Sequence, residues 1–287
     1  CSSSASGSEL PELPDLEVVR DILSPRIVGQ AVRGVEVNRP DLLRTGEGSV
    51  SLLVGKELHA IGRRGKYLLF SFGPEAHLLV HLMRWGWLWH GPHGYTPTTA
   101  TQLRLMFDDG SDLRLIEARS PYLAAVWVVP DPKTAEPLRG LGVEPLSAEF
   151  TPEVLRHLIA GKRRPLKRFL TDQSLIAGIG NAYADEILFR ARLSPVRYTH
   201  TLTEDELDRL WHAIGEALRW AIREIRARVG DALVDREVRD FLFVHGKKGN
   251  PCRECGTPIA EILFEDARTN YCPRCQGPRV VLPLRRG

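Results

Sequence analysis

Residues 252–275 read CRECGTPIAEILFEDARTNYCPRC, the most specific stretch of this 287-residue chain. Its four cysteines form two Cys-x2-Cys pairs separated by sixteen residues, which is the spacing of a four-thiolate zinc site. Two disulfide bonds are the alternative, but the only other cysteine is Cys1, and we see no secretory pattern. A closed four-cysteine site stabilises a β-hairpin too small for a core of its own and performs no chemistry. We therefore expect one structural Zn²⁺, held by Cys252, Cys255, Cys272 and Cys275.

Composition and charge exclude some classes of protein. Hydrophobic residues make up 43% of the chain and charged residues 26%, which is ordinary globular usage, and the length predicts more than one domain. No run of about 18 apolar residues occurs, so we expect no membrane span. Residues 151–287 contain 24 basic and 18 acidic side chains, whereas residues 1–150 contain 15 and 18. The basic excess of the C-terminal half is a weak indication of a nucleic-acid partner.

The pattern of apolar residues changes along the chain. Residues 14–23 have apolar positions at helical spacing behind a proline and an aspartate, which predicts one opening helix. Residues 31–130 contain six to eight short strand patterns, among them SLLVGKELHAIG at 51–62, and predict a β-sandwich or barrel. Thr203 and Glu206 form a predicted capping box ahead of a long amphipathic helix. The expected fold class is therefore α+β, with several domains.

Four motifs that stand in order with the zinc pattern resemble the bacterial formamidopyrimidine-DNA glycosylase / endonuclease VIII family. They are PELPDLE at 11–17, RRGKYLLF at 63–70, GIGN-x-Y-A-x-E at 178–186 and HGKKGNPCRECG at 245–256. The resemblance spans residues 11–276 and implies an N-terminal helix and β-sandwich, a helix–two-turn–helix (H2TH) domain and a zinc finger. The expected division is a remnant at 1–10, the β-sandwich catalytic domain at 11–130, a linker at 131–150, the H2TH DNA-binding domain at 151–243 and the zinc finger at 244–287.

The resemblance assigns the chemistry to Pro11 and Glu12. An amine that attacks C1′ of a nucleotide forms an imine, an electron sink that makes the C2′ proton removable. A terminal amine has an ordinary pKa of about 7.7–8.0 and is partly uncharged near neutral pH, unlike a lysine at about 10.4. By resemblance the secondary amine of Pro11 is this nucleophile, and Glu12 is the acid and base that opens the deoxyribose ring. Without the family pattern, Pro-Glu-Leu-Pro is only a helix entry.

In the given sequence Pro11 follows Leu10, so its nitrogen is a tertiary amide that cannot form an imine. The leading residues, CSSSASGSEL, are polar and serine-rich, and we expect them to be a cloning remnant ahead of a natural Met-Pro11 start. The form that retains residues 1–10 should then be inactive. If those residues are native, a non-catalytic zinc-finger protein that binds damaged or abasic DNA becomes the favoured interpretation. A third possibility is that Cys1 supplies both an amine and a thiol.

The same resemblance implies contacts with DNA phosphates. Lys66, which we predict on a strand beside a glycine turn and count among the catalytic residues, would bind a phosphate flanking the lesion; the alternative is a surface lysine. Asn181 follows Gly-Ile-Gly at the start of a predicted helix, where it would bind a phosphate or serve only as the N-cap. Arg268 resembles the finger arginine that grips phosphates, but the family has this arginine one residue earlier, where Ala267 stands.

Base extrusion leaves a gap in the duplex that protein side chains fill. In the family one filler follows a His-x-x motif, and HLMRWG at 81–86 has Arg84 at that position with Met83 beside it. A second loop supplies Arg119, and also Tyr122 if the loop is re-registered, because Ser-Pro-Tyr replaces the family's Arg-Phe-Gly. The alternative, which we favour for most of them, is that Met83 and the nearby tryptophans are alternate core residues of a strand, namely Trp85, Trp87 and Trp89.

The interval between the long helix and the zinc pattern is several residues shorter than in family members that excise 8-oxoguanine. This favours oxidised pyrimidines, ring-opened purines or abasic sites as substrates. The resemblance thus predicts a bifunctional DNA glycosylase and AP lyase of base excision repair, which forms a proline imine and cleaves the strand by β,δ-elimination. The expected partner is double-stranded DNA with a damaged base or abasic site. We expect a monomer in the bacterial cytoplasm, associated with the nucleoid.

Overall fold

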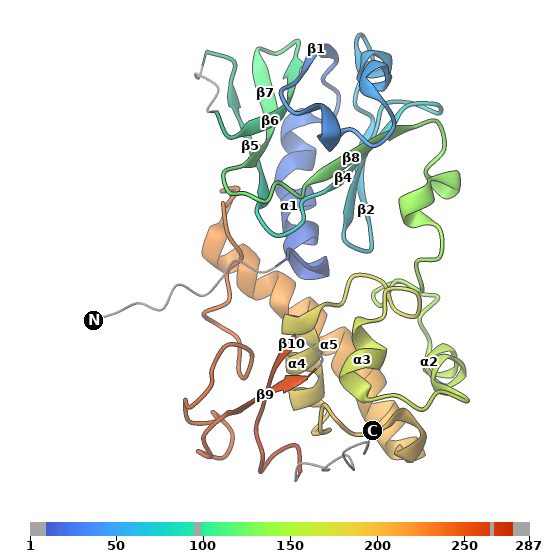
Figure 1. The fold of residues 1–287 in the computed structure, drawn as a ribbon, viewed down its shortest axis with the longest axis vertical. Coiled ribbons are helices and arrows are strands. Elements are labelled where there is room, and N and C mark those ends of the chain that lie inside the picture. Colours follow the sequence, from blue (N-terminus) through green and yellow to red (C-terminus); the bar gives the residue numbers. More distant parts are fainter. Residues whose placement is uncertain (1–9, 95–98, 265–266, 278–287) are drawn as a thin grey trace. The chain divides into compact units, whose positions relative to one another are not determined.

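The computed structural model describes residues 10–94, 99–264 and 267–277 (Figure 1). Contacts within the chain divide it into two units. Unit 1 contains the described residues up to Arg139 together with Ile222–Val238, and unit 2 contains Gly140–Ala221 and the described residues from Arg239 onward. Unit 1 is therefore assembled from two separate stretches of the chain.

Two four-stranded antiparallel sheets and one helix make up most of unit 1. The strand order is β1-β6-β7-β5 in one sheet and β2-β3-β4-β8 in the other. Apolar residues of both sheets and the helix form one core, as predicted for a β-sandwich. The elements are α1 (Leu13–Ile27), β1 (Val32–Val37), β2 (Ala60–Arg64), β3 (Tyr67–Ser71), β4 (His77–His81), β5 (Gly86–Pro92), β6 (Thr101–Phe107), β7 (Ser111–Glu117) and β8 (Ala125–Val129).

The strand predicted over residues 51–62 is wrong in its first part. Glu47–Leu53 form a 3-10 helix, η2, and β2 begins only at Ala60. Gly55 lies between them with a φ of 79°, a left-handed conformation that favours glycine and turns the chain after η2. The other 3-10 helices among the described residues are single turns: η1 (Pro40–Leu42), η3 (Pro132–Thr134), η4 (Glu136–Leu138) and η5 (Thr199–Thr201).

Strand β5 has its tryptophans on the face opposite to the one predicted. Gly86 and Leu88 are buried, and Leu88 belongs to the sandwich core, whereas Trp87 and Trp89 are only half-buried. The favoured prediction of these tryptophans as core residues is therefore wrong. The guanidinium of Arg114 lies 4.6 Å from the centre of the Trp89 ring, so this ring covers a charged side chain on the outer face of the sheet.

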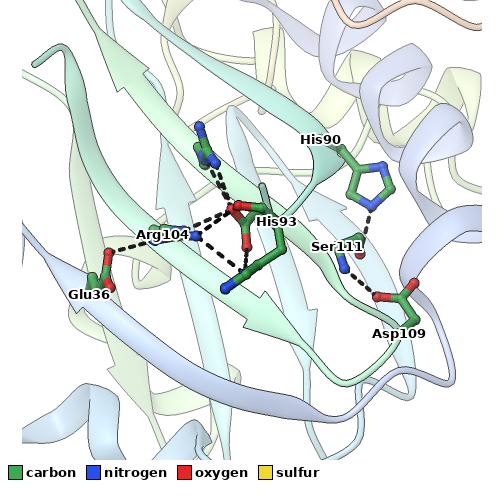
Figure 2. Close-up of polar contacts among 8 residues, drawn as sticks. Glu36, His90, His93, Arg104, Asp109 and Ser111 are labelled. Carbon is green, nitrogen blue, oxygen red and sulfur yellow. Dashed lines mark hydrogen bonds and ion pairs between the residues drawn. The ribbon is translucent and has the colours of Figure 1, made fainter. Parts of the chain in front are cut away.

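A buried charged cluster lies on this sheet (Figure 2). Asp112 of β7 is fully buried and accepts hydrogen bonds from Arg104 Nε at 2.8 Å and Arg114 Nη2 at 2.6 Å. Its second oxygen lies 2.9 Å from His93 Nδ1, and Arg104 also donates to Glu36 at 3.1 Å. Burial alone would raise the pKa of Asp112, but the hydrogen bonds from Arg114, His93 and Arg104 hold this pKa below its ordinary value. The cluster is thus an internally paired network.

Unit 2 contains α2, α3, α4, most of α5 and the hairpin with the four cysteines. Its elements are α2 (Pro152–Ile159), α3 (Leu166–Thr171), α4 (Asn181–Arg190), the part of α5 (Glu204–Val229) up to Ala221, β9 (Ala260–Phe264) and β10 (Ala267–Tyr271). The Thr203 N–H donates to Glu206 Oε2 at 2.9 Å and the Glu206 N–H donates to Thr203 Oγ1 at 3.3 Å, which confirms the capping box. Within the described ranges, no helix is long and apolar enough to cross a membrane.

Candidate functional site

Pro11 and Glu12 lie at the first turn of α1, in unit 1. Glu12 is the N-cap of this helix and is 3% exposed, and Pro11 beside it is half-buried. The backbone N–H of Glu12 donates to Asp15 Oδ2 at 2.8 Å, and the Glu12 carbonyl accepts the Leu16 N–H at 3.2 Å. The peptide that follows Pro11 is therefore fixed to the first turn of α1.

Pro11 borders a mostly apolar pocket formed entirely by unit 1. One wall is α1, with Leu16 and Ile22, and another is the start of β5 with its preceding loop, including Arg84. The third wall is formed by residues 232–238, which belong to the short interval between the long helix and the zinc pattern. The structure thus brings the predicted nucleophile and one predicted gap-filling residue to the same pocket. Nothing in the sequence pattern of 232–238 indicated this placement.

Lys66 lies at the tip of the β2–β3 hairpin rather than on a strand, so that part of its prediction is wrong. Arg64 pairs with Tyr67, which leaves Gly65 and Lys66 as a two-residue turn, and Gly65 has the positive φ, 58°, that such turns require. Arg63 Nε donates to Glu17 Oε1 of α1 at 2.7 Å. The hairpin that carries Lys66 is therefore held to the helix that begins next to Pro11.

The loop predicted to fill the gap in the duplex is shaped by His81. Burial, and secondly the charge of Lys66, lowers the pKa of His81 to about 4, so this imidazole is neutral at physiological pH. His81 Nδ1 accepts the Met83 N–H at 3.1 Å, and Met83 has a φ of 53°, a conformation uncommon for residues other than glycine. A Cβ on Gly86 would lie 2.4 Å from the Leu82 carbonyl oxygen, so the tight turn requires glycine there.

The second predicted loop lies next to the first. Arg119 and Tyr122 are both exposed, and the guanidinium of Arg119 lies 5.2 Å from the centre of the Trp85 ring. The guanidinium of Arg39 lies 5.6 Å from the Tyr122 ring centre. Arg119 and Tyr122 were predicted from the sequence, whereas Arg39 was not, because it lies about eighty residues earlier and no local pattern indicates it. The two loops are therefore neighbours in unit 1.

In unit 2, Asn181 is the exposed first residue of α4. The N-cap is Gly180 in an extended conformation, so the alternative in which Asn181 is the N-cap is wrong. The backbone N–H groups of the first turn of a helix have no partner within that helix and favour anions. An exposed Asn181 side chain therefore adds a hydrogen-bond donor to an end of α4 that already favours a phosphate.

Arg268 is exposed on β10, opposite Leu263 of β9. Its strand is held to the helices by a buried ion pair: Lys167 Nζ of α3 lies 2.7 Å from Asp185 Oδ1 of α4 and donates to the Arg268 carbonyl at 3.0 Å. The second Asp185 oxygen accepts the Asn270 N–H at 3.0 Å and lies 2.7 Å from His245 Nδ1. Asp185 therefore joins the helix that begins with Asn181 to the strand that carries Arg268.

The four cysteine sulfurs all lie within 4.8 Å of one another. The Sγ atoms of Cys252 and Cys275 are 3.9 Å apart and those of Cys255 and Cys272 are 3.4 Å apart, distances too long for disulfide bonds. A tetrahedral Zn²⁺ with Zn–S bonds of about 2.3 Å would place its ligands about 3.8 Å apart. Burial raises the pKa of Cys272, whereas hydrogen bonds with Thr257 lower the pKa of Cys255 to about 6. The thiols therefore fit one structural zinc ion, whose charge would favour their thiolate forms.

Comparison with protein families covers most of the chain. Residues 10–122 match the formamidopyrimidine-DNA glycosylase N-terminal domain, residues 141–230 match the formamidopyrimidine-DNA glycosylase H2TH domain, and residues 249–277 match the zinc finger found in FPG and IleRS. The formamidopyrimidine-DNA glycosylase of Symbiobacterium thermophilum is 39% identical, over 97% of this chain and 95% of that protein. That of Geobacillus kaustophilus is 35% identical, over 93% and 100%.

Solved structures give the same result. The complex of Lactococcus lactis Fpg with abasic-site DNA matches with a TM-score of 0.82 and 29% identity, covering 92% of this chain and 99% of that one. The complex of Lactococcus lactis FPG (MutM) with FAPY-dG-containing DNA matches with a TM-score of 0.83 and 30% identity, over 92% and 99%. A β-sandwich, an H2TH bundle and a four-cysteine zinc finger in one chain define a class of multidomain DNA repair enzymes. The chain belongs to the formamidopyrimidine-DNA glycosylase family and is a DNA glycosylase of base excision repair.

Proposed function

We propose that this chain is a bifunctional DNA glycosylase and AP lyase whose nucleophile is the nitrogen of Pro11, once that nitrogen is a free amine. The observation that carries the proposal is the fixed pair at the start of α1: Pro11 borders a pocket, and the adjacent Glu12 is 3% exposed. A buried carboxylate next to an amine is suited to proton transfer. The relatives of this chain are named as glycosylases, which does not favour the non-catalytic alternative.

The proposed reaction proceeds in stages. The lone pair of the Pro11 nitrogen attacks C1′, the bond from C1′ to the base breaks, and the departing base takes up the proton that the nitrogen loses. Glu12 protonates O4′, so that the sugar ring opens and the nitrogen forms an iminium with C1′. This iminium accepts the electron pair released when the C2′ proton is removed, and the 3′ phosphate leaves. Loss of the C4′ proton then expels the 5′ phosphate in a second elimination, and water hydrolyses the iminium to free the sugar fragment and the Pro11 amine. The strand is left with phosphate at both ends of the gap.

We propose that residues other than the nucleophile hold the DNA. Lys66, Asn181 and Arg268 bind phosphates, since each lies at a turn, a helix start or an exposed strand position that a phosphate can reach. The gap left by the extruded base is filled from the neighbouring loops of unit 1, by Met83, Arg84, Arg119 and Tyr122.

The proposed substrate is double-stranded DNA with an oxidised pyrimidine, a ring-opened purine or an abasic site. Structural relatives have been solved with DNA that contains an abasic site, FAPY-dG or carbocyclic 8-oxo-G, and the first two belong to the proposed range. The chain is proposed to act as a monomer in the bacterial cytoplasm at the nucleoid, since its relatives are bacterial and its partner is DNA.

Borohydride trapping on abasic DNA tests the proposal. Protein that begins at Pro11 should give a covalent complex, and protein that retains residues 1–10 should give none, because an amide nitrogen cannot form the imine. The Glu12→Gln variant should trap about 10²–10⁴-fold more slowly. Asp21→Asn, which removes an exposed carboxylate from the same helix, is the matched control and should behave as the parent protein. Binding of abasic DNA without trapping or strand cleavage would refute the catalytic role of Pro11.

A further inference from the structure

Glu117, the last residue of β7, is a fully buried carboxylate that the proposed reaction does not use. Its Oε1 accepts the Leu123 N–H at 2.7 Å and the Ala124 N–H at 3.0 Å. Its Oε2 accepts Arg39 Nη1 at 2.9 Å. A buried carboxylate destabilises the fold unless it is paired and hydrogen-bonded, and these contacts provide both. These hydrogen bonds of the Glu117 carboxylate all come from Arg39 or from the far end of the loop that starts after β7.

Arg39 contacts the same loop at two further points. Its Nη2 donates to the Ala124 carbonyl at 2.6 Å, and its guanidinium lies 5.6 Å from the ring centre of Tyr122. One guanidinium therefore contacts the buried acid, the end of the loop and the exposed aromatic ring near its tip. Because a guanidinium is planar and forked, it fixes these three groups more rigidly than an ammonium group would.

Strand register connects this loop with the other gap-filling loop. Glu117 is paired directly with Gly86, the first residue of β5. The loop of residues 82–85 therefore ends, and that of residues 118–123 begins, at one pair of facing strand residues. Beyond this pair, the guanidinium of Arg119 lies 5.2 Å from the Trp85 ring centre.

We infer that Glu117 and Arg39 are positioning residues for base extrusion. They hold residues 118–123 so that Tyr122 and Arg119 can enter the gap in the duplex, and they act through this loop rather than on the reacting atoms. This inference rests on the proposed function, because a gap arises only if a base leaves the stack.

Abasic DNA in single-stranded and double-stranded form separates insertion from chemistry. Both forms need the same imine, but only the duplex has an unpaired opposite base and a gap to fill. We expect the ratio of the duplex to the single-strand trapping rate to fall about tenfold in Glu117→Gln, which weakens hydrogen bonds to a charged group. Tyr122→Ala should lower this ratio similarly. In Arg39→Lys, which keeps the charge but loses the fork, the fall should be smaller.

Asp112→Asn is the matched control, because Asp112 is also fully buried on β7 and is also paired with arginine. It should leave the ratio within about twofold of the parent protein, even if the variant is less stable. Since the single-strand rate is measured on the same preparation, partial unfolding of a variant cancels in the ratio.

A direct readout of insertion is the fluorescence of 2-aminopurine placed opposite the abasic site. The change that follows binding should be slower in Glu117→Gln and unaltered in Asp112→Asn. An unchanged ratio in Glu117→Gln, or an equal fall in Asp112→Asn, would overturn the inference while leaving the proposed function standing. If the parent protein traps neither substrate, the proposed function fails and this inference fails with it.

Discussion

His81 shows how a single neutral side chain determines the shape of a loop. Its Nδ1 accepts the Met83 N–H, which requires that this nitrogen carry no proton. Burial and the charge of Lys66 lower its pKa to about 4, so the accepting form persists throughout the physiological range. The positive φ of Met83 is uncommon for such a side chain, and this hydrogen bond supports it.

At this residue we predict a loss of stability in acid. Between pH 6.5 and about 4 the unfolded chain binds a proton at His81 that the folded chain does not, so stability falls as pH falls through this window. The full difference corresponds to about 3 kcal/mol. Urea unfolding at pH 7 and pH 4 measures this difference in stability, and hydrogen exchange in residues 77–90 locates it. Between these two pH values, His81→Gln should lose less stability than the parent protein. His59→Gln, an exposed control, should lose the same amount as the parent protein.

Among single residues, predictability depended on whether the signal was local. Glu12 and Asn181 stand inside recognisable motifs, and both lie at helix starts, although Asn181 is not the N-cap. Lys66 was expected on a strand because it directly precedes the apolar residues of β3. The sequence does not mark where the two-residue turn after Arg64 ends and the strand begins. The proposed positioning pair, Arg39 and Glu117, was not visible, because its partners are 78 residues apart.

At the scale of elements, the Lys167–Asp185 pair joins two helices and a strand. Both side chains are at least nine-tenths buried, and the pair contacts the backbone of residues 268 and 270 on β10. A buried ion pair is weak evidence of net stabilisation, but removing one partner leaves a charge in a medium that solvates it poorly. The pair therefore determines where the strand with Arg268 lies against α4.

We predict that Lys167→Met will destabilise unit 2 by about 3–5 kcal/mol, because Asp185 stays buried without its counter-charge. The double variant Lys167→Met/Asp185→Asn should lose less than the single one, since the uncompensated charge is gone. Chemical denaturation gives the two free energies, and hydrogen exchange in residues 267–271 locates the loss. A double variant that is less stable than Lys167→Met would contradict the explanation.

Periodicity identified most elements of unit 1, since strands β1 to β8 all lie within residues 31–130, where strand patterns were expected. It failed where apolar residues do not alternate into the core. Leu52 is exposed and Leu53 buried in a 3-10 helix, so SLLVG looks like a strand without forming one. In β5 the tryptophans were expected in the core because they occupy alternate positions of the strand, whereas Leu88 fills the core and Trp89 covers Arg114. Alternation alone cannot tell which of two apolar faces is inside.

At the scale of the molecule, zinc determines whether the finger exists. The hairpin and its knuckles have a core of only a few residues, which includes Phe189 of α4, Val244, Ile259 and the cysteines. Such a cluster is too small to fold alone, so the metal-binding free energy, about 10–16 kcal/mol for structural zinc, supplies its stability.

We predict that chelation of zinc will unfold residues 249–277 and abolish DNA binding, while the β-sandwich of unit 1 remains folded. Hydrogen exchange with and without chelator distinguishes the two regions, and metal analysis confirms the loss of zinc. Zinc-free protein that still binds abasic duplex with the original affinity would remove the finger from the DNA-binding surface.

Unit 1 is built from two stretches of chain, and this affects how the protein forms on the ribosome. Residues 222–238 pack the partly buried Leu233 against the sandwich core and form one wall of the pocket beside Pro11. They are synthesised about eighty residues after the last part of the first stretch, which at about 5–20 residues per second is a delay of several seconds. During that interval the nascent sandwich lacks its final segment. The first part of the enzyme to be translated is therefore among the last to be completed.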